Sequence, residues 1–252
     1  MCARLRDAVR GRGELRAVRT LADIADFLRR STERTDVVVV PSVDVTRRDA
    51  TGFVRETAKA FPDVALVAYC CAGFEHGSEI RALALAGVHH FFFAGEESRS
   101  VLRSTLASAR RECASARVLS ELAGVLDERL LPIVEESLRR PADVHTVADL
   151  ANAIGLHRKT LYDQCVRSGL RGPADLITWV RLALVGYLLG RTGRTVESIA
   201  DELDFASSSA LRNLLRRHVG LTGREIRANG GLACVISALQ KHLAERPRMH
   251  VV

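Results

Sequence analysis

Short apolar runs alternate with amphipathic segments over the first 110 residues. The runs DVVVV (36–40), VALVAY (64–69) and VHHFFF (88–93) are rich in β-branched and aromatic side chains, and each is too short for a typical helix. Because their apolar residues are consecutive and do not alternate with polar ones, we expect them to be strands of a sheet that is covered on both faces. Residues 50–61 and 77–87 lie between them and carry helical periodicity. This order predicts an α/β domain with right-handed βαβ units around a parallel sheet.

Further segments of these two kinds lie just before and just after these runs. Residues 14–19 (ELRAVR) are interpreted as an earlier strand and residues 20–31 as the helix that follows it. Residues 98–111 form a further helical pattern after the last strand.

The strand-like runs stop near residue 113, and only helical patterns follow. Residues 115–140 have apolar positions at three- and four-residue spacing, and Pro141 ends this run. We therefore expect an all-α second part that is joined to the first by a helix. The expected divisions are an α/β domain at 1–112, a connecting helix at 113–128, a helical domain at 129–230 and a helical extension at 231–252.

The helical domain contains an internal repeat. Residues 146–170 (TVADLANAIGLHRKTLYDQCVRSGL) align with residues 195–221 (TVESIADELDFASSSALRNLLRRHVGL). Each copy begins with a threonine that can cap a helix, passes through an apolar residue and an alanine to a short turn, and opens a second helix with polar residues. The sequence predicts two helix-turn-helix units, with one helix at 174–189 between them. Two such units about 34 Å apart would enter successive major grooves of DNA.

This repeat resembles the DNA-binding domain of the bacterial AraC/XylS transcription regulators over residues 130–227. The resemblance implies binding of double-stranded DNA through recognition helices at about 157–168 and 207–219. The residues that carry it are Ala148, Asp149, Leu150, Ala151, Gly155, Leu156, Leu161, Gly169, Arg181, Leu188, Leu189, Ile199, Ala200, Phe205, Ser209, Gly220, Leu221, Thr222 and Arg227.

Several positions depart from the pattern of that family. Asp204 stands where the family usually has glycine, so we expect its turn to be strained or of a different type. The other departures are Cys165, Leu211 and Leu215 at aromatic positions, Gly223 at a proline position and Ile226 at a tyrosine position. We expect all of them to be compatible with the fold.

The start of the second recognition helix is expected to face DNA. Ser207 can cap the helix, and Ser208 and Ser209 lie in its first turn. One turn further on, Arg212 suits a guanine edge and Asn213 suits an adenine edge. These residues are the candidates for reading the base sequence.

The other candidate contacts lie further along this helix and in the first unit. Arg216 and Arg217 are expected to meet phosphate. Tyr162 stacks on a sugar or covers the edge of the core, and Asp163 accepts a hydrogen bond from cytosine or pairs with Arg167. The candidate contacts of the first unit are Arg158, Lys159, Tyr162 and Asp163.

Charge and composition fit this interpretation without deciding it. The net charge is +7, and it comes almost entirely from arginine, because the lysines are Lys59, Lys159 and Lys241. Arginine suits phosphate and base edges, but arginine-rich proteins are also common products of GC-rich genomes. The hydrophobic fraction of 47% suits a folded core, with no run long enough to span a bilayer. The lack of a secretory signal and six scattered cysteines indicate a cytoplasmic protein.

The α/β domain has the rhythm of a two-component receiver domain and resembles that family. A receiver carries a phosphate-accepting aspartate, a hydroxyl and a lysine at the ends of successive strands, where this chain has Pro41, Cys70 and Ala94. Asp44 and Asp49 are interpreted as solvated loop acids. We therefore expect a receiver-like scaffold without phosphorylation or magnesium, which dimerises, binds another protein or holds a small ligand.

No metal site or cofactor is expected. His89 and His90 are adjacent on a strand, so their side chains point to opposite faces. An enzyme is disfavoured because the chain has no Gly-rich phosphate loop, nucleophile elbow or paired His/acid motif.

The predicted function is therefore a DNA-binding transcription regulator. A protein-interaction module that has lost DNA binding stays open as the alternative. Expected partners are double-stranded DNA, with RNA polymerase and a second copy of the chain as further candidates, the latter through the α/β domain or the connecting helix. No membrane partner is expected. The amphipathic helix at 232–245 packs back on the domain or against a second subunit.

Overall fold

The structure is a computed structural model that describes residues 2–10, 14–30, 35–41, 50–70, 77–96, 98–139, 146–191 and 194–245. The chain divides into two compact units, 1–113 and 114–252, which are treated separately below. The expectations for Asp44, Asp49 and Pro141 concern residues outside the described set.

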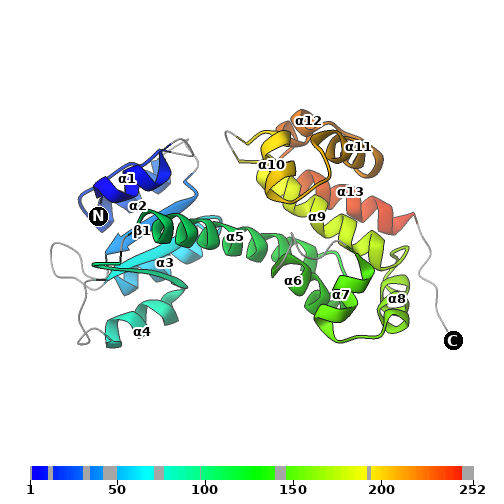
Figure 1. The fold of residues 1–252 in the computed structure, drawn as a ribbon, viewed down its shortest axis with the longest axis horizontal. Coiled ribbons are helices and arrows are strands. Elements are labelled where there is room, and N and C mark those ends of the chain that lie inside the picture. The colour runs from blue at the N-terminus through cyan, green and yellow to red at the C-terminus, as the bar shows by residue number, and fades with distance from the viewer. Residues whose placement is uncertain are drawn as a thin grey trace. The chain divides into compact units, whose positions relative to one another are not determined.

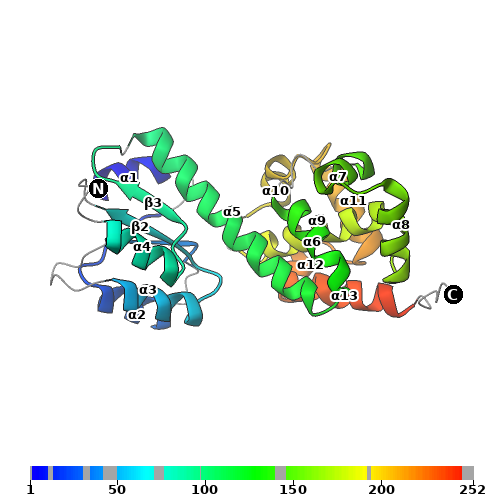
Figure 2. The same ribbon diagram turned by 90° about the horizontal axis from the view of Figure 1, so that it is seen from below.

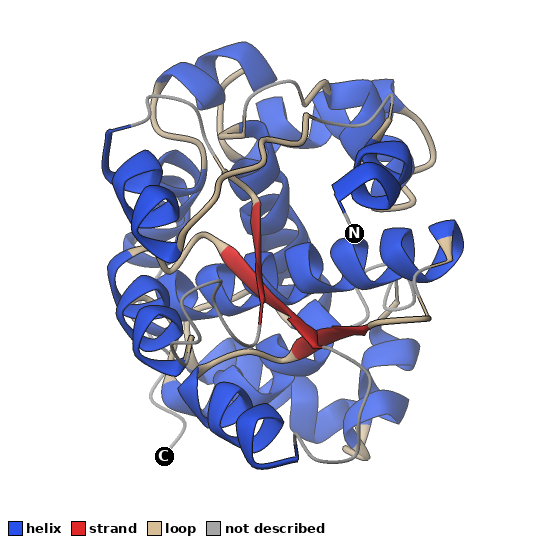
Figure 3. Ribbon diagram, turned by 90° about the vertical axis from the view of Figure 1, so that its left-hand side faces the viewer, coloured by secondary structure: helices blue, strands red, loops and turns tan. Residues whose placement is uncertain are grey.

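The first unit contains a parallel sheet of three strands in the order β1-β2-β3 (Figure 3). The register pairs Val38 with Leu66 and Ala68 with Phe91. The parallel α/β arrangement predicted from the three apolar runs is confirmed. The strands are β1 (Val37–Pro41), β2 (Ala65–Cys70) and β3 (His90–Phe93), and the helices between them are α3 (Thr51–Ala60) and α4 (Gly77–Ala86).

Helices cover both faces of this sheet. Alternate side chains point to opposite faces of a strand, and the two sets join different apolar clusters. Val38, Val40 and Leu66 pack in the cluster that includes residues of α3, α4 and α2 (Leu21–Arg30). Val67 and Phe92 pack in the other cluster, with residues of α1 (Cys2–Val9) and α5 (Arg99–Ala123).

The prediction of a strand at residues 14–19 is wrong. These residues have no strand conformation, and the sheet of the described chain begins at β1. Of this run, Leu15 packs against the core, while Val18 is 39% exposed and Arg16 lies over the ring of Phe27. Charged residues interrupt the run too often for it to bury a strand on both faces.

The ends of the three strands lie next to one another at one edge of the sheet. The backbone amide of Ala94 donates to the carbonyl of Cys70 at 2.9 Å, and Pro41 is in register with Tyr69. None of Pro41, Cys70 and Ala94 offers a carboxylate, a hydroxyl or an ammonium group. The likeness to a receiver domain stays a prediction.

The second unit consists of helices (Figures 1 and 2). Residues 114–123 of α5 belong to it, and a short 3₁₀ helix (Glu128–Leu130) follows. No described helix of the chain is long and apolar enough to cross a bilayer. The remaining helices are α6 (Leu131–Arg139), α7 (Val147–Ile154), α8 (Arg158–Arg167), α9 (Pro173–Leu189), α10 (Val196–Glu202), α11 (Ser208–His218), α12 (Gly223–Ala228) and α13 (Leu232–Ala244).

Helix α9 forms the centre of this unit. It is apolar on nearly all sides, and most of its residues are buried in one cluster with side chains of α6 to α8 and α10 to α13. Trp179, near its middle, is 1% exposed. The single helix predicted between the two helix-turn-helix units is confirmed, and its burial fixes both units to one support.

Helix α13 packs back on α9, which is one of the two alternatives left open by the sequence. A Cβ on Gly186 of α9 would lie 2.7 Å from Cγ2 of Val235 and 3.1 Å from the carbonyl oxygen of Gly231. Gly231 has a φ of 63° and stands just before α13. Glycine at both positions lets the start of α13 approach the backbone of α9 closely.

Candidate DNA-binding surface

Matching caps begin the first helix of each pair. The Thr146 hydroxyl accepts a hydrogen bond from the Asp149 amide at 3.2 Å, and the Asp149 carboxylate accepts one from the Thr146 amide. Thr195 and Ser198 form the same reciprocal pair at the start of α10, at 3.1 Å in each direction. The predicted threonine caps are confirmed, and both are complete capping boxes.

The turns after these helices both contain a residue with a positive φ. Gly155 has a φ of 65°, and Asp204, in the equivalent place, has a φ of 51°. Among the described residues, Asp204 is the non-glycine residue with a positive φ. Asp204 therefore has the left-handed φ that glycine would adopt at this position, although it carries a Cβ. Of the two alternatives expected from the sequence, a strained turn or a turn of a different type, this is the strained turn.

Arg181 of α9 supports the second turn. Its Nη2 donates to the carbonyl of Leu203 at 2.7 Å, and its guanidinium lies 4.0 Å from the ring centroid of Phe205. Burial lowers the pKa of Arg181 from its usual value, and the nearby Asp204 carboxylate opposes that shift. The turn is thus fixed to the central helix by a charged side chain.

A side chain caps the second helix of each pair. Nδ1 of His157 accepts from the Lys159 amide at 3.2 Å at the start of α8. Oγ of Ser207 accepts from the Ala210 amide at 3.0 Å at the start of α11. The cap expected at Ser207 is present, whereas the cap by His157 was not anticipated.

One side of α8 and one side of α11 are buried in the common core. Leu161 and Cys165 are buried in α8, and Leu211 and Leu215 are buried in α11. Burial, with a contribution from the nearby Asp175 carboxylate, raises the pKa of the Cys165 thiol to about 12. The smaller residues at these positions still fill the core.

The two remaining departures from the AraC/XylS pattern are also buried. Gly223 begins α12, and a Cβ there would lie 2.7 Å from Cγ2 of Val196. A proline does not fit at this distance without a shift of Val196. Ile226 is fully buried in the common core.

The opposite sides of α8 and α11 carry the residues predicted to contact DNA. Helix α11 contains no acidic residue, and its last turn is basic. In the part of the chain that the structure describes, no group of His, Cys, Asp and Glu side chains could hold a metal ion. The exposed candidates are Arg158, Lys159, Tyr162, Ser207, Ser209, Arg212, Asn213, Arg216 and Arg217, and the half-buried ones are Asp163 and Ser208.

Tyr162 has one side against the protein and one side free. It is 51% exposed. A Cβ on Gly172, whose φ is 146°, would lie 3.0 Å from the Tyr162 ring. The ring therefore covers the backbone at Gly172 and still presents surface to a ligand.

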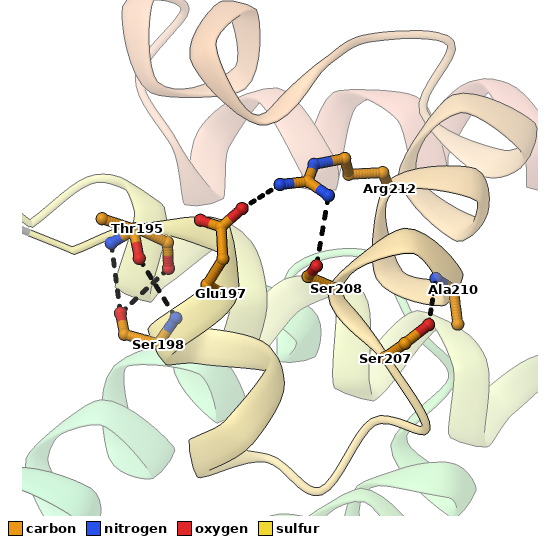
Figure 4. A network of polar contacts seen from close by, with 7 residues as sticks. All are labelled: Thr195, Glu197, Ser198, Ser207, Ser208, Ala210 and Arg212. Carbon is orange, nitrogen blue, oxygen red and sulfur yellow. Dashed lines mark hydrogen bonds and ion pairs between the residues drawn. The ribbon is translucent and has the colours of Figure 1, made fainter.

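Arg212 takes part in a polar network that the sequence did not reveal (Figure 4). Its Nη1 donates to Oγ of Ser208 at 3.1 Å, and its Nη2 donates to the carboxylate of Glu197 in α10. An acidic residue in the first turn of a helix is commonplace, so the sequence offered no signal for this contact.

Each helix pair, with its caps, left-handed turn and exposed polar side, has the geometry of a helix-turn-helix unit. Residues 150–229 match the family described as "Helix-turn-helix domain". An AraC-like transcription regulator of Streptomyces lividans is 34% identical over 104 residues, which is 40% of this chain and 33% of that protein. The HTH-type transcriptional regulator VirS of Mycobacterium tuberculosis is 34% identical over 119 residues, which is 47% of this chain and 32% of VirS.

Residues 150–229 therefore form a helix-turn-helix domain that is similar to those of AraC-like regulators, as the resemblance predicted. The chain spans about a third of the length of the curated relatives that it matches, and no solved structure matches it.

Proposed function

We propose that this protein is a sequence-specific regulator of transcription that binds double-stranded DNA through α8 and α11. The observation that carries the proposal is the attachment of two capped helix pairs to one buried helix, α9, each with a polar outer side. A rigid support of this kind holds two recognition helices at a constant separation, as reading of successive major grooves requires. The net charge of +7 supports an anionic partner.

The candidate contacts divide into two classes. Arg212 and Asn213, with the serines of the first turn, would read base edges. Arg216 and Arg217, further along α11, would bind phosphate. The first helix-turn-helix pair would contact DNA through four residues of α8: Arg158, Lys159, Tyr162 and Asp163.

We further propose four parts with the limits 1–112, 113–128, 129–230 and 231–252. The first part would be a dimerisation or signal-input module that is not phosphorylated, because the strand ends lack the required groups. RNA polymerase and a second copy of the chain would be further partners. We propose no enzymatic activity, and the relatives named above are all regulators.

Selection of sheared genomic DNA by the purified full-length protein tests this function. We expect a shared motif of two short half-sites about one helical turn apart. Enrichment without a motif would leave charge-driven binding only, and no enrichment would favour the alternative of a protein-interaction module.

Two variants separate the two classes of contact. R212A should lower affinity for the motif by about 1–3 kcal/mol and relax the preference at one base position. R217A should weaken binding to all sequences alike and reduce the salt slope by about one. A changed base preference in R217A would contradict the assignment of this residue to phosphate.

A further inference from the structure

Arg212 is held from two sides by the protein itself. A guanidinium has five N–H groups, and two of those of Arg212 are used by Ser208 in its own helix and by Glu197 in α10. Both members of the Glu197–Arg212 pair are about half exposed, so the pair lies at the surface that would face DNA. Three N–H groups remain for a ligand.

Glu197 is itself fixed in place. It lies in the first turn of α10, between Thr195 and Ser198, the two residues that form the capping box. The pKa of Glu197 lies below its usual value, because its own backbone amide donates to the carboxylate and because Arg212 and the Thr195 hydroxyl are close. The carboxylate is therefore charged at neutral pH and stands at a defined place beside Arg212.

This arrangement separates Arg212 from the other arginines of α11. Among the described residues, Arg217 forms no ion pair with a carboxylate, so its charge remains available to attract phosphate. Arg216 forms none among these residues either, although it is close enough to Glu225 to help lower the pKa of that carboxyl. The charge of Arg212 is balanced by Glu197, and a phosphate brought close to it would also meet the carboxylate. A like charge placed against the wrong partner is a common source of specificity.

We propose that Glu197 is a positioning residue for base recognition: it orients Arg212 toward a base edge and disfavours contact of Arg212 with phosphate. This inference rests on the proposed DNA-binding function. It assigns a role in specificity to an acidic residue of the first helix of the unit, outside the recognition helix.

The test compares E197Q with E202Q in the full-length protein. Glu202 is at the other end of α10 and pairs with Arg194 at 2.5 Å, so both variants remove one carboxylate charge from the same helix. R212A and the double variant E197Q/R212A complete the set. The intrinsic fluorescence of Trp179, which lies in the core of this unit, verifies that each variant is folded.

Selection from a random double-stranded DNA library gives the base preference, and anisotropy titrations with the selected site and its single-base variants give the affinities. In E197Q we expect discrimination at the base read by Arg212 to fall by about fivefold or more, toward the value in R212A. Binding to unrelated DNA should strengthen, with a salt slope steeper by up to about 0.9. E202Q should keep the base preference of the wild type, and E197Q should have no further effect on it in the R212A background.

The failures are distinguishable. If the wild type selects no motif, the proposed function itself is wrong. If it selects a motif and E197Q or R212A keeps the full preference, the role of Glu197 is wrong and the DNA-binding function stands. A loss of affinity in E197Q for all DNA would also overturn the inference, because it would make Glu197 a direct contact or a structural residue.

Discussion

Asp204 allows a direct test of the backbone conformation that makes the second helix-turn-helix pair equivalent to the first. Its φ of 51° is close to the 65° of Gly155, although it carries a Cβ. We consider two substitutions, Asp204→Gly and Asp204→Ala. Both remove the carboxylate and its interaction with Arg181, so the difference in stability between the two variants reports the backbone conformation alone.

The magnitude follows from the cost of the left-handed conformation. A Cβ in this region costs about 1–2 kcal/mol, and glycine loses roughly 0.5–1 kcal/mol more backbone entropy on folding. D204G should therefore be more stable than D204A by about 1 kcal/mol. Gly155→Ala should destabilise the helical unit by a similar amount, because a Cβ there would meet no atom within 4 Å and the cost is conformational.

Trp179 provides the assay. It is the single tryptophan of the chain and is 1% exposed in the core of the helical unit, so its fluorescence follows the unfolding of that unit. In urea titrations, 1 kcal/mol corresponds to a shift in midpoint of about 0.3–1 M for ordinary slopes.

Gly124→Ala serves as the control in the same unit. Gly124 is not among the glycines with positive φ, and a Cβ there would have its nearest contact at an ordinary 3.5 Å. This variant should be neutral or up to about 1 kcal/mol more stable. Equal midpoints for D204G and D204A would refute the left-handed turn at Asp204.

Three further predictions concern the core around α9. Gly186→Ala should cost about 1–3 kcal/mol, because the added carbon overlaps Val235, and a urea midpoint unchanged from the wild type would contradict the docking of α13 on α9. Burial lowers the pKa of His218, and the nearby Asp175 carboxylate partly opposes this shift, while the positive charges of His242, Arg217 and Arg171 add to it. The unfolded chain therefore binds more protons than the folded one below about pH 6.5. Stability should be complete above that pH and fall on acidification toward pH 5, and thermal melts of H218Q should show a smaller fall. Cys165, with its pKa raised to about 12, should resist alkylation at pH 8 while the exposed Cys2 reacts, as peptide mass spectrometry would show; Cys165 should become labelled only on unfolding.

Elements that depend on near neighbours along the chain are predictable from the sequence. The apolar runs predicted the three strands, and the repeat predicted two helix pairs with one helix between them. The caps at Thr146, Thr195 and Ser207 were predictable because a side chain there bonds to an amide only three residues away. The prediction of a strand at 14–19 was wrong, because a strand inside a sheet covered on both faces must bury its side chains and the charged residues of this run cannot be buried.

The contacts between distant segments could not be predicted from the sequence and are known from the fold alone. The Glu197–Arg212 pair joins residues fifteen positions apart and depends on the crossing of α10 and α11. The docking of α13 depends on close approach of the backbone at Gly186 and Gly231, and a glycine in a sequence does not reveal which neighbour will occupy the space beside it. Periodicity and caps are local properties of a chain, whereas ion pairs across helices and backbone contacts follow from packing, which selects one arrangement among many that the same local pattern permits.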